Sequence, residues 1–306
     1  MVRNFLFHRV NPQRDKLWDP MDVKLFDKTI HYISKKYQVE LIENLVHSKD
    51  LNKKNHFATI MFDDGYLDNL EYAAPILAKY KVPASFYVVT DCIDQNIPTW
   101  THILEHQFIH TKMRAIDLNF DFIHAAFKNG EFNGEIDRIA FVQKLKPYLK
   151  KCTHEQRSII LQRIAETFID VEIPKIMMNW AEVNQLKSAG HYIGSHTCSH
   201  CMLGTMSDEN EIANELTLSR HRIEEKLGHK SVSISYPVGS YNEMTIKLSK
   251  AAGYSLGLAV KQDLYNPQRD NLFEIPRIEL YNESWLKTRL RISHALEKIK
   301  SAIRYK

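Results

Sequence analysis

The chain of 306 residues is 44% hydrophobic and 25% charged, with 10 glycines and 10 prolines. These values are ordinary for globular proteins and exclude wholesale disorder and fibrous repeats. The net charge of +4 is too small to indicate a nucleic-acid partner by itself. The length allows one large domain of the α/β-barrel type or two small ones.

The amino-terminal residues do not have the pattern of a targeting or membrane segment. The apolar run at residues 5–7 is interrupted by His8 and Arg9, and no later window holds 18 apolar residues without a charge. We therefore expect a cytoplasmic protein, unless it binds a membrane peripherally. Four cysteines in a chain of this length do not make a disulfide framework, so reduced thiols are expected.

Apolar segments and helical patterns alternate along the chain. Strands are predicted at residues 4–7, 56–62, 84–89, 192–195, 232–236, 256–260 and 274–280. Helices are predicted at residues 21–37, 67–80, 179–189, 207–227 (with Ser207 as the N-cap), 242–252 and from 283 to the end. Residues 95–178 show mostly helical periodicity and few strand signals.

This alternation predicts a mainly parallel sheet that is covered by helices. Seven strands suit an incomplete β/α barrel better than an eight-stranded one. Residues 1–306 then form a single domain, with a helical insertion at about 95–178. In such folds functional residues lie where strands end. Polar clusters follow three of the predicted strands, and they contain His8, Asp63 with Asp64, and His196 with His200.

The paired aspartates and histidines together suggest a metal centre. Adjacent side chains on an extended chain point to opposite sides, so Asp63 and Asp64 can have different roles, one binding a cation and one acting as a base. His196 and His200 would share one face if their segment is helical. An aspartate with two histidines leaves open positions on a metal, as catalytic sites that activate water do.

Simpler interpretations of the same residues remain open. The aspartates could belong to a solvated loop with a helix N-cap, and the histidines to a polar loop in a chain with 15 histidines. Cys198 or Cys201 could also close the site as a structural zinc ligand, although these cysteines interleave with the histidines where zinc-finger spacing would separate them.

Three segments resemble the motifs of the polysaccharide deacetylases, the NodB-homology domain of carbohydrate esterase family 4. Ile60-Met61-Phe62-Asp63-Asp64-Gly65-Tyr66 resembles the first motif, Thr-Phe-Asp-Asp-Gly. The segment from His196 to His200 matches the second motif, His-Ser/Thr-x-x-His. Ser235-Tyr236-Pro237-Val238-Gly239 looks like the third, Arg-x-Pro-x-Gly. The resemblance implies an incomplete seven-stranded β/α barrel of the NodB type.

The resemblance also implies a reaction and its catalytic groups. Asp63 would be the general base, while Asp64, His196 and His200 would hold a divalent metal, usually Zn²⁺. The metal would polarise the acyl carbonyl and stabilise the oxyanion. The expected reaction is hydrolysis of the N-acetyl group of a sugar in a surface polysaccharide or a lipid-linked glycan precursor. The expected partner is a carbohydrate and not a nucleic acid.

Two departures from the family pattern require substitutes. Ser235 stands where the family has an arginine that orients the catalytic aspartate, and Arg277 at another predicted strand end could replace that arginine. A surface salt bridge is the alternative for Arg277. The family's Leu-x-His motif, which supplies the general acid, is not evident, and His294 inside the terminal helix is a poor candidate.

His8 is the substitute for that general acid. Its segment resembles the Tyr-His motif that opens the circularly permuted poly-N-acetylglucosamine deacetylases. A histidine of near-neutral pKa can protonate a leaving amine. A histidine that caps the strand end is the alternative.

Four further residues are expected to contact the substrate. Tyr236 and Pro237 lie in the third-motif loop, where Tyr236 could supply a backbone donor or a wall. Thr197 could orient ligands or substrate. Trp100, or alternatively Trp180, could stack on a sugar ring, although aromatic residues of the insertion more often form a small core. As a lid beside the groove, the insertion could set the size of the substrate.

The basic excess of the chain is concentrated in the last predicted helix, an amphipathic segment at about 283–304. Residues 284–306 carry seven lysines and arginines against one glutamate, so the rest of the chain is slightly acidic. The segment could be a helix docked on the barrel with a basic solvent face. It could instead make peripheral membrane contact with anionic lipid headgroups.

Two other functions remain open from the sequence. The same fold and metal could hydrolyse a C–N bond in a small amide or imide. Alternatively, the absence of the arginine and terminal histidine motifs would suit a catalytically impaired module that binds glycans.

Overall fold

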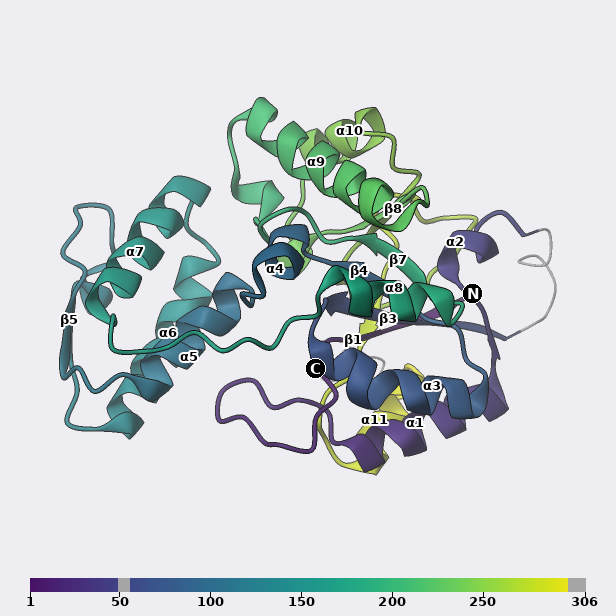
Figure 1. The fold of residues 1–306 in the computed structure, drawn as a ribbon, viewed down its shortest axis with the longest axis horizontal. Helices are drawn as coiled ribbons and strands as arrows, with labels where there is room; N and C mark the ends of the chain where they lie inside the picture. Colours follow the sequence, from purple (N-terminus) through teal and green to yellow (C-terminus); the bar gives the residue numbers. More distant parts are fainter. Residues whose placement is uncertain (49–55, 297–306) are drawn as a thin grey trace, which may run out of the picture.

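The computed structural model describes residues 1–48 and 56–296, and its centre is a curled parallel sheet (Figure 1). The strands follow the order β10-β1-β3-β4-β7-β8-β9, and every pairing along this path is parallel. Their bounds are β10 (Ile278–Glu279), β1 (Arg3–Phe7), β3 (Phe57–Asp64), β4 (Ser85–Val88), β7 (Tyr192–Ser195), β8 (Ser233–Ser235) and β9 (Leu256–Leu258).

The two edges of this sheet almost meet. Leu258 of β9 forms a single bridge with Ile275, which leads into β10 at the other edge. A short additional strand, β2 (Gln38–Val39), pairs with the start of β3. The curled sheet confirms the predicted incomplete barrel of the NodB type.

All residues of β3 are buried, and successive side chains of a strand point to opposite faces of the sheet. The strand therefore packs on both faces, against the barrel interior and against the outer helices. Phe57 and Met61 face the barrel interior, while Ile60 and Phe62 pack under the outer helices. Asp63, two residues beyond Met61, therefore points into the barrel at the carboxyl end of the sheet.

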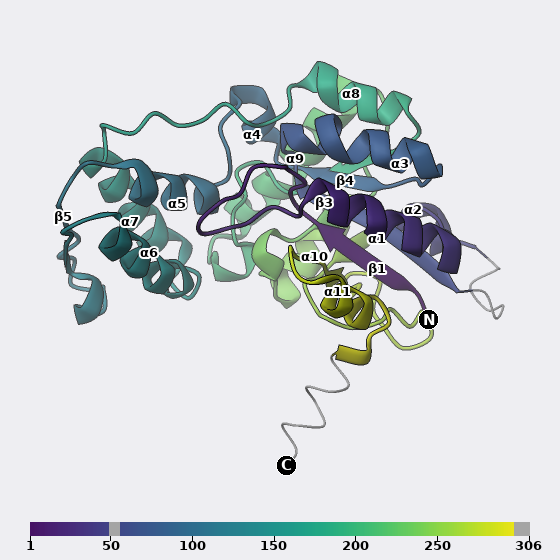
Figure 2. The ribbon, with the colours of Figure 1, turned by 90° about the horizontal axis from the view of Figure 1, so that it is seen from below.

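Helices cover the outside of the sheet (Figures 1 and 2). They are α1 (Val23–Lys36), the π-helical turn η2 (Asn69–Ala73), α3 (Ala74–Tyr80), α4 (Thr90–Gln95), α8 (Trp180–Ser188), α9 (Glu209–Leu227), α10 (Glu243–Ala251) and α11 (Trp285–Ile292). Helix α9 starts one residue later than predicted. Its N-cap is Asp208 and not Ser207, because the Asp208 carboxylate accepts hydrogen bonds from the backbone N–H groups of Asn210 and Glu211. Helix α2 (Ile42–Leu45) was not predicted.

The predicted helical insertion lies to one side of the barrel (Figure 1). It contains α5 (Trp100–His110), α6 (Glu135–Leu149), α7 (His154–Thr167) and the turn η3 (Ala125–Phe127). These helices share their own core, in which Phe108, Leu145 and Ile160 are fully buried. A two-stranded antiparallel sheet of β5 (Ala115–Asp117) and β6 (Asn129–Glu131) was not predicted, because each three-residue strand is exposed at both ends and carries little hydrophobic pattern.

The prediction of one continuous helix from residue 283 is wrong at residues 293–294. Helix α11 ends at Ile292, and His294 has a φ of 62°, in the left-handed region. Within α11 the apolar face is docked: Trp285 packs at 5.6 Å from the Tyr32 ring of α1, and Ile292 is buried. The rest of the proposed lipid-binding segment, 297–306, lies outside the described residues.

Among the described residues, no helix has the length and apolar character that a membrane crossing requires.

Candidate active site

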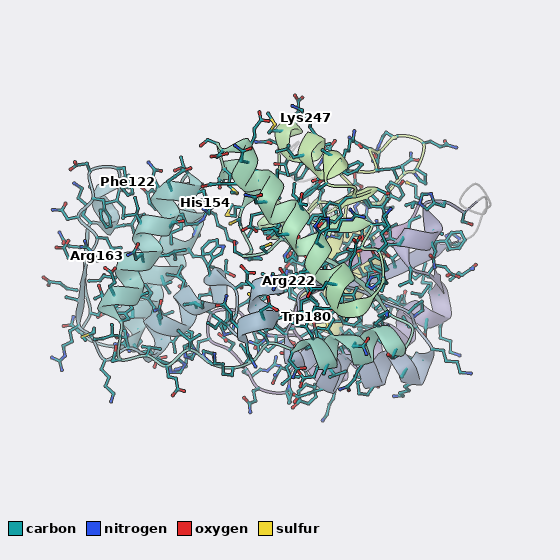
Figure 3. All side chains as sticks on the ribbon, turned by 45° about the horizontal axis from the view of Figure 1, so that its top comes forward. Phe122, His154, Arg163, Trp180, Arg222 and Lys247 are labelled. Carbon is teal, nitrogen blue, oxygen red and sulfur yellow. The ribbon has the colours of Figure 1, made fainter. Side chains whose placement is uncertain are left out.

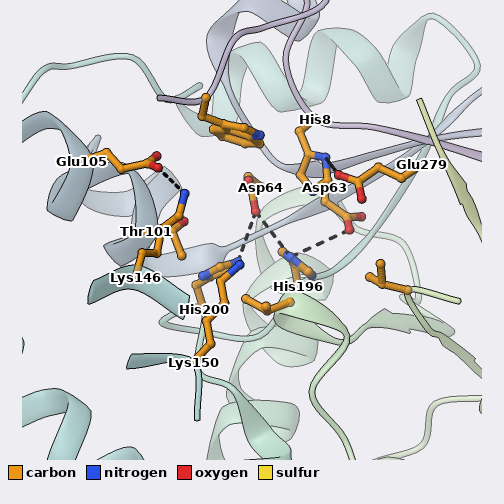
Figure 4. Close-up of a pocket in the computed structure, with 13 residues that line it drawn as sticks. His8, Asp63, Asp64, Thr101, Glu105, Lys146, Lys150, His196, His200 and Glu279 are labelled. Atoms are coloured by element: carbon orange, nitrogen blue, oxygen red, sulfur yellow. Dashed lines mark hydrogen bonds and ion pairs between the residues drawn. The ribbon is translucent and has the colours of Figure 1, made fainter. Parts of the chain in front are cut away.

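Asp64, His196 and His200 meet at the carboxyl end of the sheet (Figure 4). Asp64 is the last residue of β3, and His196 directly follows β7. Asp64 Oδ1 lies 3.4 Å from Nε2 of each histidine. All three side chains are buried. The structure thus brings together the three residues that the sequence predicts as metal ligands.

Several residues at the site have left-handed backbone conformations. Asp64, Thr197 and His200 have φ values of 78°, 67° and 61°, which residues with a Cβ adopt only at a cost. Gly65 follows with a φ of 91°, and a Cβ there would lie 2.9 Å from the Ile93 side chain. Such strain at non-glycine positions is typical of functional loops.

The hydrogen bonds of the site suit a bound cation. His196 Nδ1 lies 2.7 Å from the Ser235 carbonyl, which can only accept, so Nδ1 carries the proton and Nε2 keeps its lone pair. Asp64 Oδ1 is buried and makes no hydrogen bond with the described residues. One carboxylate oxygen and two imidazole nitrogens are a donor set that a divalent ion such as zinc accepts.

The pKa shifts of Asp64 and His200 are consistent with this role. For His196, burial lowers the pKa but Asp63 and Asp64 raise it by more. Burial raises the pKa of Asp64, but the neighbouring His196 and His200 lower it by more, so the carboxyl stays ionised well below its ordinary range. Burial lowers the pKa of His200 to about 3, which keeps this imidazole neutral at pH 7. Metal ligands need these deprotonated forms.

Arg277 takes the place of the arginine that the third motif lacks. Its Nη1 donates to Asp63 Oδ1 at 2.8 Å, and its Nη2 donates to Ser235 Oγ at 2.9 Å. Ser235 Oγ in turn donates to Asp63 Oδ2 at 3.0 Å. Because the Arg277 side chain is completely buried, the alternative of a surface salt bridge is excluded.

This contact decides the charge of Asp63. Burial raises its pKa, but the positive charge of Arg277, together with His196, lowers it by more, and the net pKa is below the ordinary value. Asp63 is therefore an ionised carboxylate in a dry environment. Its Oδ2 lies 4.0 Å from His196 Nε2, next to the metal-ligand cluster.

His8 reaches the same pocket from the end of β1. Its Nδ1 lies 3.5 Å from Glu279 Oε1, and its ring meets the Trp18 ring edge-on at 5.2 Å. The Asn69 side-chain amide donates to the His8 carbonyl at 2.8 Å and so ties the end of β1 to the loop after β3. Asp68, beside it, pairs with Arg9 at 2.9 Å. These contacts hold His8 beside Asp63 and Asp64.

A pocket of about 220 Å³ opens above these groups. Its lining is formed by His8, Trp18, Asp63, Asp64, Thr101, Glu105, Lys146, Lys150, His196, His200, Val238, Val260 and Glu279. The barrel supplies the aspartates and histidines, the loop after β1 supplies Trp18, and the insertion supplies the opposite wall from α5 and α6 with its C-cap residue Lys150.

Trp100 does not reach this pocket, contrary to the prediction that it contacts the substrate. Its ring packs in the core of the insertion, with the Arg157 guanidinium 5.5 Å from its centre. Its neighbour Thr101 lines the pocket instead. Trp180 is on the outer face of the molecule (Figure 3), where its Nε1 donates to Asp94 at 2.7 Å.

Tyr236, Pro237 and Thr197 are also absent from the pocket lining. The Tyr236 ring is buried against Tyr241, and its backbone N–H donates to the Leu258 carbonyl, so neither is free for a substrate. Pro237 and Thr197 are buried as well. The residue of the third-motif loop that lines the pocket is Val238.

Several pocket residues were not predicted. Glu279 lies two residues after Arg277, and side chains two residues apart on a strand point to the same face of the sheet. This spacing was the signal that could have identified Glu279 as a neighbour of the site. Lys146 and Lys150 are four residues apart in a helical pattern that contains several other lysines. No local signal separates them from an ordinary solvated helix face.

Glu215 of α9 braces the loop that carries both histidines. Its Oε2 accepts hydrogen bonds from the backbone N–H groups of Cys198 at 2.9 Å and Ser199 at 3.0 Å. Its Oε1 accepts one from Ser199 Oγ at 2.7 Å.

The cysteines do not act as ligands in this arrangement. Burial raises the pKa of Cys198 to about 12 and that of Cys201 to about 12, which keeps both thiols protonated. Within the described part of the chain, the only cluster that could hold a metal is Asp64 with the two histidines. The alternative of a structural Cys/His zinc site is therefore wrong for these residues.

Comparison with solved structures shows what this fold is similar to. The deacetylase PplD of Streptococcus pyogenes, solved in complex with acetate, is 15% identical with a TM-score of 0.62, over 95% of this chain and 97% of that one. IcaB from Ammonifex degensii is 14% identical with a TM-score of 0.61, over 95% of this chain and 96% of that one. At these identities the likeness concerns the fold.

Comparison of sequences points the same way. "Putative polysaccharide deacetylase YxkH" of Bacillus subtilis (strain 168) is 29% identical over 80 residues, which are 26% of this chain and 28% of that protein. The match thus spans less than a third of that relative's length. The family model described as polysaccharide deacetylase matches residues 50–130 and 135–257, well over half of the chain. The chain therefore belongs to the polysaccharide deacetylase family.

Proposed function

We propose that this protein is a metal-dependent deacetylase that hydrolyses the N-acetyl group of an amino sugar in a surface polysaccharide or a glycan precursor. One observation carries the proposal: an ionised, arginine-held Asp63 lies beside a three-ligand cluster, with His8 in the same pocket. The family supports it, and so does the likeness to PplD, which was solved with acetate, the product expected here.

Asp63 has the geometry of a general base. Arg277 and Ser235 occupy its oxygens from the barrel side, which fixes the carboxylate and keeps it ionised. A water molecule in the pocket can then give its proton to Asp63 as its oxygen attacks the acetyl carbon. A divalent ion such as zinc, held by Asp64, His196 and His200, would polarise the acyl carbonyl and stabilise the negative charge on its oxygen.

His8 has the position of the general acid. An amide nitrogen leaves only when it is protonated, so a proton must reach it as the C–N bond breaks. His8 lines the pocket, where its Nδ1 lies 3.5 Å from Glu279 Oε1. One water is consumed, the C–O bond of acetate forms, and the sugar keeps a free amine.

Acetate release from N-acetylated chito-oligosaccharides tests the function. We expect release from the zinc-loaded protein, loss of release with a chelator and recovery when zinc is added back. Asp63→Asn is the matched control, because it removes the base and leaves the ligand cluster in place. A folded, zinc-loaded protein that releases no acetate from any N-acetylated glycan, but cleaves a small amide or imide, would establish the rival hydrolase instead.

The non-catalytic alternative loses its main support. A glycan-binding module was suggested by the missing arginine and terminal histidine motifs, yet Arg277 contacts Asp63 and His8 lines the pocket. Cytoplasmic location, contact with a membrane and the identity of the sugar stay predictions that the same purified protein can test.

A further inference from the structure

Each carboxylate of the pocket already has a neighbouring polar or charged partner. Four carboxylates among the described residues line it. Asp63 is held by Arg277, and Asp64 lies between the two histidines. Glu105 is paired with Lys146, and Glu279 lies beside His8. No carboxylate of the pocket is therefore left over to neutralise a further cation.

Lys150 is that further cation. It is the C-cap residue of α6, and its half-buried side chain lines the pocket. Figure 4 shows Lys150 on the side of the pocket opposite His8 and Glu279. Among the described residues, its ammonium group has no hydrogen-bond or ion-pair partner, whereas Lys146 one turn earlier has Glu105.

The direction of the Lys150 pKa shift agrees with this lack of a direct partner. Burial lowers the pKa of Lys150, and the neighbouring Lys146 lowers it further. Glu105, Glu279 and Asp64 act in the opposite direction, but more weakly than these effects together. A partly dehydrated ammonium group with no counter-ion is costly, and a divalent ion on Asp64 would add like charge nearby.

The hydroxyl and carbonyl oxygens of a neutral N-acetylated sugar can accept hydrogen bonds from this ammonium group but do not neutralise its charge, whereas an anionic group on the substrate does both. Thr101, on the same insertion wall, offers a hydroxyl group beside the lysines. Phosphate and carboxylate oxygens both accept charge-assisted hydrogen bonds from an ammonium group, so they share the chemistry that this wall provides.

Building on the function proposed above, we propose that Lys150 is a specificity-determining residue that selects N-acetylated glycans carrying a phosphate or carboxylate group at or next to the reacting sugar. Lys150 binds that oxyanion from the insertion wall, while the barrel side of the pocket carries the hydrolysis. The insertion then determines the charge of the substrate as well as forming a wall.

Three disaccharides of equal length test the proposal: diacetylchitobiose, its 6-phosphate, and N-acetylglucosamine linked to glucuronic acid. We expect kcat/KM for acetate release to be about tenfold higher for at least one anionic disaccharide than for the neutral one. Lys150→Gln should remove this preference, because it lowers kcat/KM for the anionic disaccharide about tenfold more than for the neutral one, and Lys150→Arg should retain it. Lys144→Gln, an exposed lysine of the same helix, is the control for net charge.

The outcomes separate this proposal from the function on which it rests. Equal rates on all three disaccharides, or an equal fall on all three in Lys150→Gln, would overturn it. The phosphate and carboxylate arms show which oxyanion is preferred. Calorimetric titration of the same disaccharides into zinc-loaded Asp63→Asn protein, with and without Lys150→Gln, measures the preference without turnover. If no disaccharide loses acetate, the proposed function fails, while a charge preference in binding that depends on Lys150 still supports the inference.

Discussion

Two buried carboxylates occupy opposite ends of the barrel interior, and they are bound in different ways. Asp63 lies at the carboxyl end of β3 and is held by Arg277. Glu43, on α2, accepts hydrogen bonds from the hydroxyls of Tyr87 at 2.6 Å, Ser233 at 2.7 Å and Ser85 at 2.8 Å. Ser85 and Ser233 are the first residues of β4 and β8, so Glu43 lies at the amino end of the sheet.

The two carboxylates differ in their partners, because the Arg277 guanidinium contacts Asp63 whereas hydroxyl groups donate to the Glu43 side chain. Burial raises the pKa of Glu43, and the three hydroxyl donors offset only part of this, so its pKa is above the ordinary value. Burial also raises the pKa of Asp63, but Arg277 and His196 reverse the sign. Hydroxyl dipoles can satisfy a buried carboxyl group without keeping it ionised, whereas a buried counter-ion keeps it charged and able to accept a proton.

Strand β8 donates a hydrogen bond to the buried carboxylate at each end of the barrel. Ser233 and Ser235 lie on the same face of β8, two residues and therefore about 7 Å apart. Ser233 donates to Glu43 and Ser235 donates to Asp63. The fold thus places similar hydroxyl groups at both ends, and the arginine that reaches only one of them makes the chemical difference.

Replacing each buried carboxylate by its amide, one at a time, should give the largest difference in kcat. We expect Asp63→Asn to lower kcat for acetate release by about a thousandfold, because it deletes the general base. Glu43→Gln, measured in the same assay, should leave kcat close to that of the native protein. Zinc content of both variants should match the native value. An Asp63→Asn variant that keeps more than about a tenth of the native kcat would refute the role of Asp63.

Replacing Arg277 should raise the pKa of Asp63, as burial raises that of Glu43. Arg277→Gln leaves a buried carboxylate without its counter-ion, so we expect a loss of about 3–5 kcal/mol in the free energy of unfolding. The acidic limb of the pH profile of kcat/KM should move to higher pH, because the pKa of Asp63 is no longer lowered by Arg277. Arg277→Lys should restore part of the native profile, and an unmoved acidic limb would argue against this electrostatic role.

The third test concerns His8, the proposed general acid, which lines the same pocket as Asp63. His8→Ala should lower kcat by about a hundredfold, since the leaving amine loses its proton donor. Zinc binding should stay unchanged, because His8 lies outside the ligand cluster. Substrates with better leaving groups should be less affected than the natural amide. Undiminished turnover with full metal occupancy would remove His8 from the mechanism.

The smallest effect is expected at the Glu43 end, in the pH dependence of stability. The pKa of Glu43 is raised in the folded protein, so above its ordinary value of 4.5 the folded state binds more protons than the unfolded state. Native stability relative to Glu43→Gln should therefore fall as pH rises through this window. Thermal unfolding from pH 4.5 to pH 8 measures it, and about 1 kcal/mol corresponds to about 2 °C in Tm. A difference in Tm that stays constant or grows with pH would contradict the raised pKa.

Most of the fold was predictable because its signals are local. The strand that ends in Asp64 and the helices that begin after Asn179 and Asn242 are defined by apolar periodicity and capping residues within a few positions. Predictions failed where the local signal is weak or ambiguous. Asp208 and Ser207 are both good N-caps, and β5 and β6 are too short for a hydrophobic pattern.

The substrate-facing residues were the least predictable part of the site. Tyr236 was expected to supply a backbone donor or a wall of the groove, and Trp100 was expected to stack on a sugar ring, yet both side chains pack in cores. Trp18, from the loop after β1, reaches the pocket instead. Which aromatic ring is exposed depends on how the insertion and the barrel pack together, and residue type does not determine this.

By itself the sequence predicted which residues gather at the candidate site, because Asp63, Asp64, His196 and His200 lie in short motifs at strand ends that parallel pairing brings to one edge. Their roles as base and metal ligands stay proposals. Only the tertiary structure decided which partners these groups meet. Arg277 contacts Asp63 across 214 residues of sequence, and Lys150 enters the pocket from a separate helical core. Closure of the barrel and docking of the insertion are long-range events that local periodicity does not encode.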